Sequence, residues 1–201
     1  MKLFNLEGSA IFGSGSEWFW SMLQFLVVAA TLIGLYRQVR LQSSQTAVSQ
    51  LSSLEVEWFS EPSTHYKLAV LTALRDGVDP ANLPRAAAQA IARMWEKIGI
   101  LAHQGHLDHR LLWNSLGTAC GWWWATLDPF ARRVRSEMSD PLVLEHFEWL
   151  AGLMTEMDNS AGIPIKYEPF SGVVLAAQIA DCEERLRVDQ AVRTVIAVRS
   201  R

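Results

Sequence analysis

The sequence has few cysteines, no excess of basic charge and none of the short motifs that mark common catalytic sites. Cys120 and Cys182 lie far apart without CxxC spacing, which favours two buried, reduced thiols over a disulfide or a zinc site. Lysine and arginine number 18 against 21 aspartate and glutamate residues, which gives a net charge of −3. Nucleic-acid-binding domains are usually strongly basic, so we expect no nucleic-acid partner.

The common catalytic motifs are also missing from the sequence. They are HExxH, the Walker lysine loop, GxGxxG after a strand and GxSxG. We therefore predict no catalytic residues and no cofactor, and an enzyme is the less favoured interpretation. The two-residue alternation of half-buried strands is also missing, whereas apolar residues recur at helical spacing. The predicted fold class is all-α.

The sequence does contain a long apolar segment near its start, residues 18–36, which carries no charge. A helix of this length covers about 28 Å, close to the ~30 Å hydrocarbon core of a bilayer. Aromatic rings that favour the membrane interface occur at both ends, and basic residues follow. The predicted interface residues are Trp18, Trp20, Tyr36, Arg37 and Arg40. We predict a single transmembrane helix with the lipid bilayer as its partner.

The flanking charges predict the orientation of this helix. Arg37 and Arg40 follow the segment with no acidic residue before Glu55, whereas residues 1–17 are nearly neutral. By the positive-inside rule, residues 1–17 form a short exterior tail, and the rest lies in the cytoplasm at a bacterial inner membrane. A cleaved signal peptide would need a shorter apolar core behind a basic leader. A buried soluble helix is the other alternative.

The remaining chain predicts a helical stalk over residues 37–60, a bundle core over 61–158, and a loop plus C-terminal helix over 159–201. Together they form a cytoplasmic bundle of about five to six helices by capping and turn signals. An apolar seam along the stalk predicts that it docks on its own domain. The seam consists of Ala47, Leu51, Leu54 and Trp58. Helix starts are predicted at Ser60, Pro84, Asp108, Asp140-Pro141 and Ser171, and a break or kink at Pro129.

A second uncharged stretch, residues 111–127, has two interpretations. Its polar residues and two glycines favour the central helix of a soluble bundle. The alternative is a second membrane span, which would reverse the topology of everything after it. In that case the stretch and Gln24 would line the pore of an oligomeric, membrane-perturbing effector.

A histidine cluster and a basic face are the two other candidate sites. The cluster consists of His103, His106, Asp108 and His109, which could supply zinc ligands for a metal-dependent hydrolase or nuclease. The simpler interpretation makes Asp108 a helix N-cap and leaves these four as weak metal candidates, so we predict no metal. The basic face consists of Arg132, Arg133 and Arg135, which we predict as partner-binding candidates.

Part of the sequence resembles a known protein family. The run from Trp95 to Leu101, then Gly105, Leu107 and Asp108, then Trp123, Leu127, Pro129 and Arg133 or Arg135, is similar to a family of uncharacterised bacterial proteins. The resemblance covers about residues 18–152. It implies a single-pass, membrane-anchored protein with a helical cytoplasmic domain of unknown function, and no activity. The predicted function is therefore an interaction module, namely a scaffold, sensor or assembly subunit with a protein partner or a second copy of itself.

Overall fold

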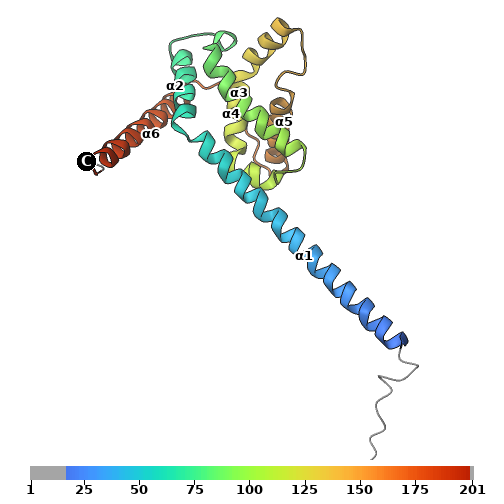
Figure 1. The fold of residues 1–201 in the computed structure, drawn as a ribbon. Helices are drawn as coiled ribbons and strands as arrows, with labels where there is room; N and C mark the ends of the chain where they lie inside the picture. The colour runs from blue at the N-terminus through green and yellow to red at the C-terminus, as the bar shows by residue number, and fades with distance from the viewer. Residues whose placement is uncertain (1–16, 200–201) are drawn as a thin grey trace, which may run out of the picture. The chain divides into compact units, whose positions relative to one another are not determined.

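The computed structural model describes residues 17–199, and over that range it is all-helical with no strand, as predicted. The predicted exterior tail lies outside the described residues except for Glu17. Among these described residues, six α-helices and one short 3-10 helix, η1, follow one another (Figure 1). They are α1 (Glu17–Trp58), α2 (Glu61–Arg75), η1 (Pro80–Asn82), α3 (Arg85–His103), α4 (His109–Met138), α5 (Glu145–Ser160) and α6 (Gly172–Arg199).

By its internal contacts the chain divides into two compact units, residues 1–48 and 49–201. In the first unit, the part of α1 from Trp20 to Gln38 is long and apolar enough to cross a membrane, and it is the one such segment among the described residues. None of it is buried in protein. Because no glycine or proline occurs between residues 37 and 58, α1 continues without a stop signal to Trp58.

The core of the second unit begins with the last turns of α1. Leu51, Leu54 and Trp58 of the predicted seam are buried there, while the side chain of Ala47 lies outside the described part. The Trp58 ring meets Trp95 of α3 edge-on at 5.1 Å and Trp123 of α4 at 5.8 Å between centroids. Apolar burial of such large rings is the main stabilising contribution to a helical core of this kind.

The uncharged stretch from 111 to 127 lies within α4 and supplies much of this core. Its buried residues include Leu112, Leu116, Cys120, Trp123 and Leu127. The predicted N-caps Ser60 and Asp108 are found at the starts of α2 and α4. Ser60 Oγ accepts a hydrogen bond from the Ser63 N–H, and Asp108 Oδ1 accepts one from the Leu111 N–H at 2.8 Å.

A predicted break and a predicted helix start differ from the structure. First, α4 is not broken at Pro129, where a break or kink was predicted, but continues to Met138, and Phe130 and Val134 beyond the proline are buried. Their packing outweighs the unfavourable helix propensity of proline. Second, α5 does not begin at Asp140-Pro141. Asp140 instead accepts a hydrogen bond from the Leu142 N–H within a turn, and α5 starts at Glu145 after Leu144, whose φ of 61° is left-handed.

Candidate functional site

The predicted histidine cluster is dispersed among structural contacts. Asp108 caps α4, and His109 Nε2 lies 3.1 Å from the Ala102 carbonyl oxygen. The His103 ring contacts the rings of His146 and Trp149, at 5.4 and 4.9 Å between centroids. Within the described part of the chain, no three His, Cys, Asp or Glu side chains converge as metal ligands do. His106 is exposed. These positions therefore fit helix-end and ring-packing roles.

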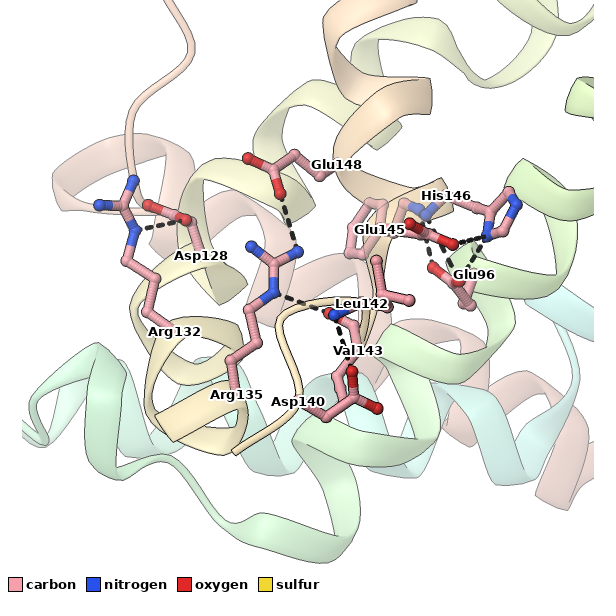
Figure 2. Close-up of polar contacts among 11 residues, drawn as sticks. Glu96, Asp128, Arg132, Arg135, Asp140, Leu142, Val143, Glu145, His146 and Glu148 are labelled. Carbon is pink, nitrogen blue, oxygen red and sulfur yellow. Dashed lines mark hydrogen bonds and ion pairs between the residues drawn. The ribbon is translucent and has the colours of Figure 1, made fainter. Parts of the chain in front are cut away.

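The three arginines of the predicted partner face each bind an acceptor of their own chain, and Figure 2 shows the contacts of Arg132 and Arg135. Arg132 Nε lies 2.8 Å from Asp128 Oδ1, and its side chain is 74% exposed. Arg133 donates to the Asn82 side chain at 2.9 Å. Arg135 holds the turn before α5, because its Nε donates to the Val143 carbonyl at 2.8 Å and its Nη2 lies 2.7 Å from Glu148 Oε2. Partner binding by this face stays a prediction, and Arg132 is its most exposed member.

The start of α5 is held by a carboxylate from α3. Leu144, at the N-cap position, makes no side-chain capping bond. Glu96 supplies the missing acceptor: its Oε2 accepts from the Phe147 N–H at 2.8 Å, and its Oε1 lies 2.9 Å from His146 Nδ1 (Figure 2). An anion at a helix N-terminus also interacts favourably with the helix dipole. Glu96 is therefore an N-cap provided by another helix.

The neighbours of Glu96 complete this junction between α3 and α5. The fully buried Trp95 ring stacks on Phe147 at 5.7 Å between centroids. Gly99 faces the His146 backbone so closely that a Cβ would lie 2.3 Å from its carbonyl oxygen. At the start of α5, Trp95 thus provides a stacking surface and Glu96 an N-cap. Gly99 leaves the space that the α5 backbone needs. This gives the family-like run at residues 95–101 a structural role.

We expect Glu96→Ala to lower the free energy of unfolding of the domain by about 1–2 kcal/mol, the usual cost of losing an N-cap. The loss arises because the Phe147 N–H and His146 lose their carboxylate acceptor. Urea unfolding followed by circular dichroism measures it. Glu156→Ala is the matched control, since Glu156 is exposed on the same α5. Equal stability losses in the two variants would contradict the capping role of Glu96.

An open pocket of about 400 Å³ lies in the second unit, lined by α2, α4, α6 and the Trp58-Phe59 corner. Most of its apolar lining residues are aromatic. They include Trp58, Phe59, Trp122, Trp123 and Phe170. Its polar lining includes Lys67, Gln178, Asp181, Cys182 and Arg185. A pocket with apolar walls and a few polar groups is the usual form of a small-molecule site.

The loop before α6 places Phe170 in this pocket. The Phe170 N–H donates to Thr126 Oγ1 of α4 at 3.1 Å. Nearby, the Tyr167 hydroxyl donates to Asp158 Oδ2 at 2.6 Å, and Trp113 Nε1 donates to Asp158 Oδ1 at 2.8 Å. Partial burial, together with the hydrogen bond to Asp158, raises the pKa of Tyr167. The loop is thereby tied to both α4 and α5.

Lys67 is the unusual group in the pocket, because a lysine is rarely buried. Lys67 is only 5% exposed. Its Nζ donates to the Trp58 carbonyl at 2.7 Å and lies 4.2 Å from the centre of the Trp58 ring. Burial, reinforced by Arg185 and opposed by Cys182 and Asp181, lowers the pKa of Lys67 to about 8. Burial raises the pKa of the Cys182 thiol, which keeps it neutral.

Lys67 was not predicted as a site residue, although its position in the sequence carries a signal. Thr64, Lys67 and Leu71 follow one another at intervals of three and four, so helical periodicity places the lysine on the face that Leu71 buries. The aromatic lining from α4 was foreseen only as core packing. Of the predicted membrane-interface residues, Trp18, Trp20, Tyr36 and Arg37 are exposed, and the side chain of Arg40 lies outside the described part.

The described residues thus define an all-helical domain that follows one helix long and apolar enough to cross a membrane. The family model of a domain of unknown function, DUF4760, matches residues 21–154, which is more than half of the chain. The chain belongs to this family. The match agrees with the resemblance predicted over residues 18–152. No curated protein and no solved structure matches the chain.

Proposed function

We propose that the chain is a membrane-anchored helical interaction module whose domain faces the cytoplasm of a bacterium. The observation that carries this proposal is the Trp20–Gln38 segment, which is apolar over 19 residues and not buried in protein. Its exposed large side chains include Phe25, Leu26, Val27, Leu32 and Ile33. A continuous apolar surface of this kind is unfavourable in water and marks a membrane or protein contact. Its length matches the hydrocarbon thickness of a bilayer.

The cytoplasmic orientation is supported by charge and by thiol state. Arg37 and Arg40 follow the uncharged residues 18–36, and basic residues of short flanks stay on the cytoplasmic side. Cys120 and Cys182 are both free and buried, which suits a reducing compartment. The module then lies at the inner membrane with its helical domain inside.

Binding is favoured over catalysis because three of the four hydrolase candidates have structural contacts. Asp108 caps α4, His109 Nε2 lies 3.1 Å from the Ala102 carbonyl oxygen, and the His103 ring packs on Trp149. The partner we propose is a protein or a second copy of the chain, and the contact surface includes the exposed Arg132. Exposed charged residues at such a surface steer association more than they add affinity.

Charged substitutions within the segment test the anchor. Val27→Glu combined with Leu32→Glu is expected to release the full chain from membranes, because each charge costs about 2.5–3.5 kcal/mol near the centre of a span. Val56→Glu is the matched control: it is a 70% exposed valine on the same helix outside the segment, and this variant should stay anchored. Alkaline extraction of membranes and the intact mass of the protein give the readout.

In this experiment the wild-type protein and the Val56→Glu variant should remain in the membrane pellet at full mass, and the double variant should leave it. Two results would overturn the anchor. The first is wild-type protein in the soluble fraction, which would make the segment a helix of a soluble protein. The second is a mature protein that lacks the segment, which would make it a cleaved signal peptide.

A further inference from the structure

The charges in the pocket between α2, α4 and α6 do not balance. Asp181 and Arg185 are paired with each other at 2.9 Å between Oδ2 and Nε. Cys182 is a neutral thiol, because its burial raises its pKa. The α4 wall contributes only uncharged side chains. Lys67 remains, and among the residues that the structure describes no carboxylate lies within ion-pair distance of its Nζ.

Lys67 is an ammonium in a pocket with aromatic residues, and Asp181, which acts on it electrostatically, is paired with Arg185 instead. Such an ammonium is available to an anion. Buried charges are normally paired, because removing an unpaired charge from water is costly. The charge of Lys67 is partly compensated by the Trp58 carbonyl and by the face of the Trp58 ring. An ammonium has three N–H donors, and the Trp58 carbonyl uses one of them. Two donors therefore remain for a ligand.

The walls restrict the rest of the ligand. Phe59, Trp122 and Phe170 offer ring surfaces, and the pocket volume of about 400 Å³ suits a small organic molecule rather than a peptide or a whole lipid. Trp122 and Phe170 are stacked on each other at 5.8 Å between centroids, so they form one apolar cluster beside the pocket. Such walls bind alkyl or aromatic groups and exclude strongly hydrated ions.

We propose that this pocket binds a small apolar carboxylate, with Lys67 holding the carboxylate and the aromatic side chains covering its apolar part. The proposal goes beyond the interaction module described above. It rests on contacts within the helical domain alone, so it does not depend on the orientation of the membrane segment. A module that binds such a molecule would respond to the concentration of a free apolar acid.

The test uses the full chain in lipid nanodiscs, with octanoate as the probe and octanamide as its uncharged match. Binding is measured by calorimetry, and heats from empty nanodiscs are subtracted. We expect octanoate to bind about tenfold more tightly than octanamide, as one charge-assisted hydrogen bond allows. Lys67→Met should remove this preference and leave octanamide binding unchanged. Lys166→Met is the control, since Lys166 is 87% exposed, and should keep the preference.

The wild-type protein supplies a second measurement that does not depend on a folded variant. Lys67 loses its proton around pH 8, while Arg185 stays charged and octanoate stays ionised. The dissociation constant of octanoate should therefore rise about tenfold between pH 7 and pH 9.5, whereas that of octanamide should stay constant. Equal affinities for the two probes, no binding of either, or an octanoate affinity that is flat across this range would overturn the proposal.

Discussion

Replacing Gly99 by alanine is expected to destabilise the helical domain by about 1–3 kcal/mol, the usual cost of overpacking. A Cβ at this position would lie 2.3 Å from the carbonyl oxygen of His146 and 2.6 Å from its carbonyl carbon. Both are backbone atoms, so no side-chain rotation relieves the clash and α5 must move away from α3. That movement also weakens the cap that Glu96 provides to α5. The loss exceeds the ~1 kcal/mol by which alanine is favoured over glycine within a helix.

Gly152→Ala is the matched control, and it is expected to have the opposite sign. Gly152 lies within α5, and a Cβ there would meet no atom within 4 Å. Only the helix propensity changes, so the variant should gain roughly 0.5–1 kcal/mol. Urea unfolding of the two full-length variants, followed by circular dichroism, compares them directly. A shift of both midpoints in the same direction would contradict the close contact of α3 and α5 at Gly99.

Asp158→Ala is the second substitution with a large expected effect. Asp158 is 5% exposed, and its two oxygens accept from Trp113 Nε1 and from the Tyr167 hydroxyl. Its removal leaves two partly buried donors without an acceptor, which should lower the free energy of unfolding by about 2–3 kcal/mol. The pKa of Tyr167 should also fall towards its ordinary value, because one of the causes that raise it is lost. Ultraviolet absorbance of tyrosinate during a pH titration reports this change.

Tyr167→Phe separates the two hydrogen bonds of Asp158. It removes one donor and leaves the contact with Trp113, so its cost should be smaller, about 1 kcal/mol. The ring of Tyr167 remains in place over Gly121, where a Cβ would lie 2.6 Å from it. If Asp158→Ala were no more destabilising than Tyr167→Phe, the carboxylate would not join α4 to the loop as the structure indicates.

Features with local causes were the ones that the sequence could predict. The starts of α2 and α4 depend on Ser60 and Asp108, whose side chains bond within the next three residues. The uncharged stretch in α4 was expected to be a central helix, and its apolar residues Leu112, Leu116 and Leu127 are in the core. Capping and apolar periodicity are visible in any window of a few residues.

Features with distant causes were missed or wrong. The true start of α5 depends on Glu96, which lies about 50 residues earlier in the chain, so the local Asp140-Pro141 signal was misleading. Pro129 stays inside α4 because residues beyond it pack in the core. In the candidate pocket, Lys67 is hydrogen-bonded to Trp58, and its pKa is affected by residues of α6. Neither contact is visible in the sequence of α2. Tertiary packing overrode the local preference in each case.

Cysteine accessibility in intact cells tests the central claim, a single membrane helix with the helical domain inside. Single reporters at Ser9, Ser63 and Ser160 are treated with a membrane-impermeant thiol reagent, and the native Cys120 and Cys182 are buried. We predict that Ser9 reacts from outside, and that Ser63 and Ser160 react only after the cells are opened. Reaction of Ser63 or Ser160 in intact cells would contradict the cytoplasmic position of the domain.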